Sequence, residues 1–200
     1  MRKVPKQERS RQMVERIVRA GRQILVRDGY ASFTTNKVAD AADVSPGSLY
    51  QYFPDKASII DVIIDRYMDE VSDRVVGTLR EADGLDVARD PVMAVRTVIA
   101  ALVTAMEQDA SLLRIVTDEI PQARIHERRA ALEQRIADVV TTYLLIALNL
   151  PAATASARAW TIVLTMETLT ARWVIEQPPQ LDRAAFIDEL TALAMGYLVR

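Results

Sequence analysis

The chain has 200 residues, of which 50% are hydrophobic and 26% are charged, with no cysteine and a single histidine. This composition fits a globular protein of one large or two small domains, and it excludes a disulfide framework, a thiolate metal site and a thiol nucleophile. The formal net charge of −2 is unevenly distributed: residues 1–56 hold 11 basic and 6 acidic side chains, whereas residues 57–200 hold 14 and 21. A basic head on an acidic body favours a polyanion as the partner of the head, although a merely solvated basic helix fits the charge equally well.

The first predicted element is an amphipathic helix that covers at least Met13 to Leu25. Apolar residues recur there at steps of three and four, with arginines between them, and Gly29 ends the pattern. The preceding residues insert charges where a signal peptide needs an unbroken apolar core, so we expect a cytoplasmic protein.

A short helix of about two turns is predicted next. Thr34 or Thr35 can act as its N-cap, Val38 and Ala39 lie on its inner face, and it breaks near Asp43, a residue type that tolerates the left-handed conformation a turn requires.

A second short helix begins at Pro46. Ser45 is a favourable N-cap, and proline suits the first helical position because its missing N–H would have no intrahelical partner there. Leu49 and Phe53, four residues apart, are expected to face inward. Two short helices joined by a short turn form a helix-turn-helix, whose second helix reads base edges in the major groove of DNA.

The outer face of this second helix carries side chains that suit DNA. Gly47 lets the backbone come close to a partner, and the hydroxyls of Ser48, Tyr50 and Tyr52 can donate to phosphate oxygens or base edges. Lys56 opens the following helix, where a positive side chain and free backbone N–H groups can together hold a phosphate.

Residues from about 11 to 63 resemble the N-terminal domain of the TetR family of bacterial transcriptional regulators. The positions that match the family signature are Gly29, Thr34, Thr35, Val38, Ala39, Ala42, Val44, Ser45, Gly47, Ser48, Leu49, Tyr50, Tyr52, Phe53 and Lys56. Asp43 departs from the glycine or asparagine that is common in the turn.

The resemblance implies two groups of contacts with DNA. Phosphate contacts are expected from Thr35, Ser45, Tyr50, Tyr52 and Lys56. Base contacts are expected from Asn36, Pro46, Gly47, Ser48 and Gln51, and Lys37 completes the set of candidate DNA-binding residues.

The remaining chain shows only helical patterns. A linking helix begins near residue 55, a polar loop covers residues 80–91, and apolar residues repeat at helical spacing over 95–106 and 132–147. The uncharged stretch 139–157 contains hydroxyl and amide side chains and Pro151, so it predicts two buried helix ends and a turn rather than a membrane span, which needs roughly 20 apolar residues.

The predicted fold is all-α, with a helix-turn-helix DNA-binding domain at 1–56 and a helical domain at 57–200. The helix over about 154–176 is apolar or small on nearly every side, which suggests burial by a second subunit as well as by its own core. The resemblance implies that this helix and the one over 183–199 form the interface of a homodimer, and that the C-terminal domain holds a small-molecule effector.

The sequence does not identify the effector. Candidate ligand-binding residues are Met106, Leu113, Tyr143, Trp160, Met166, Glu167 and Trp173. At helical spacing each apolar member of this set fits core packing better than a pocket lining.

The expected function is a ligand-responsive regulator that binds a double-stranded DNA operator, in the form of a repressor released by a small molecule. The alternative is a constitutive or architectural DNA-binding protein without an effector. No enzyme is expected, nor a metal or cofactor, because one histidine, no cysteine and no glycine-rich phosphate loop leave no catalytic constellation.

Overall fold

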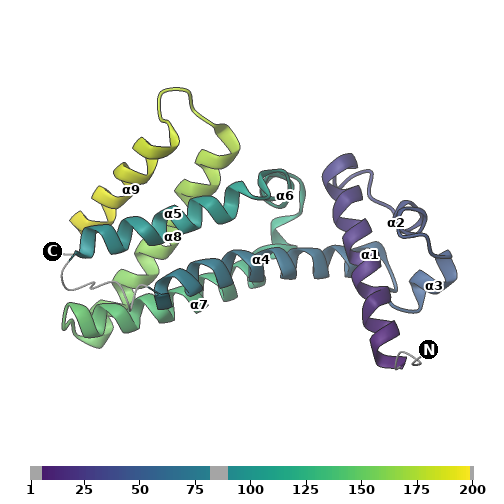
Figure 1. Ribbon diagram of the computed structural model, residues 1–200, viewed down its shortest axis with the longest axis horizontal. Coiled ribbons are helices and arrows are strands. Elements are labelled where there is room, and N and C mark those ends of the chain that lie inside the picture. Colours follow the sequence, from purple (N-terminus) through teal and green to yellow (C-terminus); the bar gives the residue numbers. More distant parts are fainter. Residues whose placement is uncertain (1–5, 82–89, 199–200) are drawn as a thin grey trace. The chain divides into compact units, whose positions relative to one another are not determined.

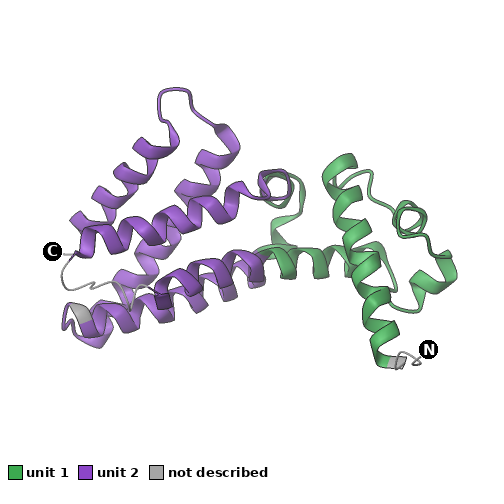
Figure 2. Cartoon of the chain, in the orientation of Figure 1, with its two compact units in different colours: residues 1–67, 114–125 green, residues 68–113, 126–200 purple. Residues whose placement is uncertain are grey.

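The computed structural model describes residues 6–81 and 90–198, and within these ranges every regular element is a helix (Figure 1). The all-α prediction is confirmed. Most of the polar loop expected at 80–91 lies outside the described residues. The described chain divides into two compact units, one made of residues 1–67 and 114–125 and the other of residues 68–113 and 126–200 (Figure 2).

The first unit contains the elements that were predicted from local patterns. Helix α1 spans Lys6–Asp28, α2 spans Thr35–Ala41, α3 spans Pro46–Tyr50, and α4 spans Lys56–Glu81, of which only the first half belongs to this unit. Gly29 follows α1 with φ of 77°, a left-handed conformation that glycine adopts without steric cost.

The core of the first unit is formed by α1, α2, α3 and the start of α4. Its fully buried side chains include Ile17, Leu25, Phe33, Val38, Leu49, Ile59 and Ile63. Helices α1 and α4 approach so closely that a Cβ atom added at Gly21 would lie 2.9 Å from Ile59 Cγ2. Glycine is therefore needed at position 21 for packing, and an ion pair between Arg66 and Glu15, at 2.6 Å, joins the same two helices.

A segment distant in sequence completes the first unit. Residues 114–125 comprise the π-helical turn η2 (Ile115–Glu119) and the start of α7 (Gln122–Ala147). The Glu119 carboxylate accepts a hydrogen bond from the backbone N–H of Tyr30 at 2.8 Å. The Arg124 guanidinium donates to Asp61 at 2.9 Å. The compact unit extends to residue 67 and includes this later segment, because contacts between distant residues define it. The functional boundary expected at residue 56 stays a prediction.

The second unit is a bundle of long helices. It contains the remainder of α4, α5 (Pro91–Glu107), the short α6 (Ala110–Arg114), most of α7, α8 (Ala152–Glu176) and α9 (Arg183–Leu198). Helix α5 packs against both α8 and α9 (Figure 1). An ion pair between Arg135 and Asp73, at 2.6 Å, joins α7 to α4.

The expectation of buried helix ends around residues 139–157 was wrong in part. Asn149 has φ of 48° and forms the turn between α7 and α8, but Ile146 is 80% exposed and Pro151 is also exposed. The apolar residues near this turn do not all reach the core, because the turn places them at the end of the bundle.

Within the described ranges, no single helix is both long enough and apolar enough to cross a membrane. Helix α5 and the segment Ala110–Glu119 reach that length and apolarity only when taken together, and they are bent by 83° with respect to each other.

Candidate nucleic-acid interface and ligand pocket

The helix-turn-helix is formed by α2 and α3, and both helices begin with the caps that the sequence predicted. The Thr34 hydroxyl accepts a hydrogen bond from the Lys37 N–H, and the Ser45 hydroxyl accepts one from the Ser48 N–H at 3.1 Å. Asp43 has φ of 51°, so the turn uses the left-handed conformation that this residue was expected to provide. These local interactions set the start of α3 and the direction in which its first residues project.

The hydroxyls of the candidate residues hydrogen-bond to one another across this surface. The Ser45 and Ser48 hydroxyls lie 2.9 Å apart at the start of α3. The Thr35 hydroxyl at the start of α2 lies 2.9 Å from the Tyr50 hydroxyl at the end of α3. Each of these oxygens retains acceptor or donor capacity for a further partner, so the pairs orient the hydroxyls without exhausting them.

The positive side chains of the surface are held in place by neighbours. The Lys37 ammonium lies 2.7 Å from the Asp28 carboxylate, which also pairs with Arg27 at 2.6 Å. These two cations, Arg27 first, hold the pKa of Asp28 well below its ordinary value. The Lys56 ammonium lies 5.3 Å from the centre of the Tyr30 ring, within cation–π range.

The start of α4 is capped by Asp55. Asp55 Oδ1 accepts a hydrogen bond from the Ser58 N–H at 2.7 Å, and this bond lowers the pKa of the Asp55 carboxyl. Lys56 therefore lies at a fixed helix N-terminus, where backbone N–H groups and the helix dipole favour an anion.

Most of the candidate DNA-binding side chains are accessible. The exposed members are Asn36, Ser45, Pro46, Gly47, Tyr50, Gln51 and Lys56, and the half-buried members are Thr35, Lys37, Ser48 and Tyr52. Gly47 is of special interest because a Cβ atom added there would meet only the Ser45 hydroxyl, at 4.0 Å. The fold of this chain does not itself need glycine at position 47, in contrast with Gly21.

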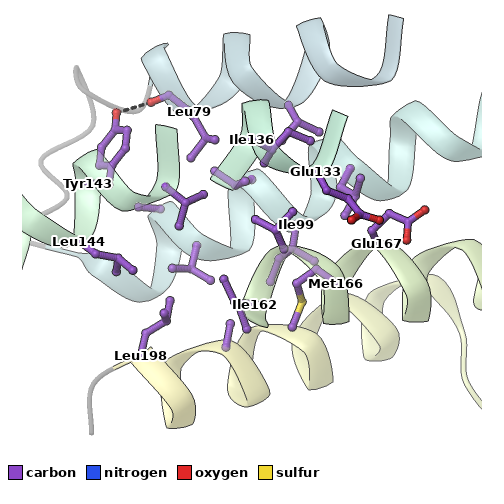
Figure 3. Close-up of a pocket in the computed structure, with 18 of the residues that line it drawn as sticks. Leu79, Ile99, Glu133, Ile136, Tyr143, Leu144, Ile162, Met166, Glu167 and Leu198 are labelled. Carbon is purple, nitrogen blue, oxygen red and sulfur yellow. Dashed lines mark hydrogen bonds between the residues drawn. The ribbon is translucent and has the colours of Figure 1, made fainter. Parts of the chain in front are cut away.

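A pocket of about 190 Å³ lies inside the second unit, between α4, α5, α7, α8 and α9 (Figure 3). Its wall is formed almost entirely by carbon and sulfur atoms. Among the described residues that line it, the polar ones are Tyr143, Glu133 and Glu167. The Tyr143 hydroxyl donates a hydrogen bond to the backbone carbonyl of Leu79, whereas the two glutamates lie at the opposite end (Figure 3).

The glutamate end of the pocket is electrostatically unfavourable for negative charge. The Glu167 carboxylate lies 3.6 Å from the Arg129 guanidinium and 3.4 Å from the Thr168 hydroxyl. Its pKa is nevertheless raised, because burial disfavours the ionised form and Glu133 adds a second negative charge nearby. Arg129 does not belong to the pocket wall.

The structure brings four of the predicted ligand-binding residues together and leaves three apart. Met106, Tyr143, Met166 and Glu167 line the pocket. Leu113 is buried outside it, Trp160 is 54% exposed, and Trp173 stacks on Phe186 with ring centres 4.8 Å apart.

Two of the three residues outside the pocket, Trp173 and Trp160, have physical reasons for their positions. The Trp173 indole N–H donates to the carbonyl of Leu181, which holds this ring near the turn before α9. Trp160 lies on the face of α8 that is turned away from the bundle core. Glu133 was missed, although its spacing from Ile136 and Val140 on α7 places the three on one helix face.

Within the described residues, no group of three or more histidine, aspartate or glutamate side chains is arranged to hold a metal ion.

Two family comparisons cover most of the chain. Residues 17–63 match the family of bacterial regulatory proteins named after tetR, and residues 90–198 match the tetracyclin repressor-like C-terminal domain.

Similar proteins include a transcriptional repressor and a nucleoid occlusion factor. The HTH-type transcriptional repressor KstR2 of Rhodococcus jostii is 33% identical over 106 residues, which cover 50% of this chain and 46% of that protein. The nucleoid occlusion factor SlmA of Photobacterium profundum is 30% identical over 126 residues, which cover 61% of each. The matched regions thus span about half to three fifths of these relatives.

Solved structures share the fold over nearly the whole chain. The fatty acid degradation regulator FadR from Bacillus halodurans superposes with a TM-score of 0.67 at 18% identity and covers 98% of this chain and 97% of its own. A regulator from Syntrophomonas wolfei gives a TM-score of 0.70 at 16% identity, with coverages of 96% and 97%. At these identities the likeness concerns the fold alone.

Proposed function

Because the chain belongs to the TetR family of bacterial regulatory proteins, we propose that it is a sequence-specific DNA-binding transcriptional regulator. The family consists of transcriptional regulators and not of enzymes. The observation that carries the proposal is the capped α2–turn–α3 unit, which presents hydroxyl, amide and ammonium groups on one accessible surface.

In this proposal α3 enters the major groove of an operator. Contacts with base edges, which carry sequence information, would be made by Asn36 of α2, by Pro46, Gly47 and Ser48 of α3, and by Gln51 at the end of α3. Phosphates on either side would be contacted by Thr35, Lys37, Ser45, Tyr50, Tyr52 and Lys56. The fixed hydroxyl pairs reduce the entropy that these side chains lose on binding.

The protein would act as a homodimer through α8 and α9. Helix α8 exposes Ala157, Trp160 and Leu169, and α9 exposes Leu193 and Gly196, which together form apolar surface that the single chain leaves accessible. Small residues permit close approach of helices, and a large exposed tryptophan is typical of interface anchors. A dimer that reads successive major grooves must hold its recognition helices about 34–36 Å apart.

The effector would occupy the pocket of the second unit and release the operator. A ligand that binds better to a conformer with a different separation of recognition helices lowers operator affinity in proportion to that difference. A coupling free energy of about 1–3 kcal/mol corresponds to roughly 5- to 150-fold weaker DNA binding.

In this proposal residues 1–56 bind DNA, residues 57–200 bind the effector and form the dimer, and the protein acts in the cytoplasm. Repression needs the fewest assumptions, because an occupied operator excludes polymerase without a further contact surface.

A second candidate is an architectural or constitutive DNA-binding protein that lacks an effector. The similarity to proteins named nucleoid occlusion factor supports this alternative. The apolar pocket supports the ligand-released repressor, because a constitutive DNA binder would have no need of such a space.

The proposal is tested by incubating the purified full chain with genomic DNA fragments of its source, then sequencing the bound fraction at several salt concentrations. Recovery of a pseudo-palindromic site supports a dimeric, sequence-specific regulator. Uniform and strongly salt-dependent binding would favour the architectural protein, and an absence of DNA binding at low salt would refute both.

A further inference from the structure

We infer that the effector of this protein is an uncharged, hydrocarbon-like molecule of about the size of one substituted ring, and that ionised carboxylates are excluded from the pocket. This inference deepens the proposed function, on which it rests for the role of the pocket as an effector site.

The polarity of the wall leaves a polar ligand without partners. Carbon and sulfur atoms form nearly the whole surface that faces the space, and the Tyr143 hydroxyl already donates its proton to the Leu79 carbonyl. A polar group that loses its hydration on entry must be compensated by hydrogen bonds, and a charged group requires even more compensation. The wall offers almost none, so a hydrocarbon-like surface is the complementary one.

The charge at the glutamate end of the pocket works against anions. Glu133 and Glu167 are the charged residues of the described wall, and both are acidic (Figure 3). The Arg129 guanidinium lies 3.6 Å from the Glu167 carboxylate but does not line the pocket. The carboxylate oxygens of Glu133 and Glu167 scarcely reach the surface of the space, but a carboxylate that entered would lie near both acidic groups and would find no basic group in the described wall. Coulomb repulsion would then add to the cost of desolvation.

The space left by the described wall fits a small molecule. A buried apolar cavity of about 150 Å³ is known to stay dry and to bind benzene. The volume of about 190 Å³ found here is modestly larger, which suits a ring with a short alkyl substituent.

The test uses three probes of nearly equal size that differ in charge at pH 7: propylbenzene, 2-phenylethylamine as its ammonium ion, and phenylacetate. Each is titrated into the full chain in the absence of DNA, and binding is followed by NMR with ¹³C-labelled methionine methyl groups. Met106, Met166 and Met195 line the pocket, whereas Met13, Met68 and Met93 do not, so the wild-type protein contains its own internal control.

We expect propylbenzene to shift the three pocket methyl groups, leave the other three unchanged, and bind at least tenfold more tightly than either ion. Substitutions E133Q and E167Q together should reduce the difference between propylbenzene and phenylacetate, while E176Q is the matched control because Glu176 is an exposed residue of α8 paired with Arg172. An unchanged difference in E133Q/E167Q would refute the role of the two acidic groups.

Three results would overturn the inference. Tightest binding of the ammonium probe, lost in E167Q, would make the glutamates an anchor for cationic ligands. Tightest binding of phenylacetate would refute the exclusion of carboxylates. A failure of all three probes to shift the pocket methyl groups would refute the stated size and polarity. Because DNA is absent, each result stands apart from the operator selection that tests the proposed function.

Discussion

Substitution of Gly47 by alanine separates the requirements of the fold from those of DNA binding. A Cβ atom at this position would meet only the Ser45 hydroxyl, at 4.0 Å. Gly47 is the second residue of α3, directly after Pro46. Alanine is more favourable than glycine by about 0.8–1.0 kcal/mol inside a helix and by less at its first turn. The free energy of unfolding of G47A is therefore expected to stay the same or to rise by less than about 1 kcal/mol.

Operator binding should respond in the opposite direction. If the backbone at Gly47 approaches base edges, a methyl group there displaces α3 and removes a base contact, which is worth about 1–3 kcal/mol. The dissociation constant should then increase by roughly 5- to 150-fold. Fluorescence anisotropy with the recovered operator measures the affinity, and urea unfolding followed by circular dichroism measures the stability.

Gly21 provides the matched control for this substitution. A Cβ atom there would lie 2.9 Å from Ile59 Cγ2 and 3.1 Å from Ile63 Cδ1, so G21A should lower the free energy of unfolding by about 1–3 kcal/mol through overpacking. If G47A binds the operator as tightly as the wild type, or loses as much stability as G21A, the reasoning about position 47 is refuted.

Three further predictions concern phosphate contacts, pH and assembly. K56A should weaken binding to operator and unrelated DNA alike, whereas Q51A should change the preference at individual base pairs. Repeated fragment selection with each variant distinguishes these two effects. An unchanged DNA affinity of K56A would contradict the phosphate contact assigned to Lys56. The hydrogen bond with Arg66 lowers the pKa of Glu15, so the native pKa lies below the unfolded one. The wild type should therefore be more stable than E15Q at every pH above the ordinary value of 4.5, and this difference in the free energy of unfolding should disappear as the pH falls through the native pKa. Urea midpoints of both proteins at several pH values measure the difference. L193E places a charge on an apolar side chain that is 48% exposed on α9, and sedimentation should show a monomer; an intact dimer would exclude this part of α9 from the interface.

The parts of the structure that sequence reasoning predicted correctly depend on local interactions. Thr34 and Ser45 cap the helices that follow them by accepting hydrogen bonds from N–H groups three residues later, and the buried Leu49 and Phe53 follow from helical spacing alone. Such features need no information about the rest of the chain, which is why the helix-turn-helix could be placed to within a residue or two.

The parts that were missed depend on contacts between distant residues. No periodicity shows that Glu119 accepts a hydrogen bond from Tyr30, which lies 89 positions earlier. Similarly, Trp160 and Met166 belong to the same apolar helix, yet the first is exposed and the second lines the pocket, since the orientation of α8 in the bundle decides which face is covered. The binding roles of the candidate DNA and ligand residues stay predictions.

The contact between Glu119 and Tyr30 has a consequence for the order in which the chain folds during synthesis. Residues 1–67 emerge from the ribosome first, but the compact unit to which they belong also includes residues 114–125. At roughly 5–20 residues per second, several seconds pass before Glu119 and Arg124 are available to Tyr30 and Asp61. The compact unit that contains the helix-turn-helix is therefore incomplete in a nascent chain until well over half of the polypeptide has been made. A fragment that ends after α4 would lack these two contacts permanently.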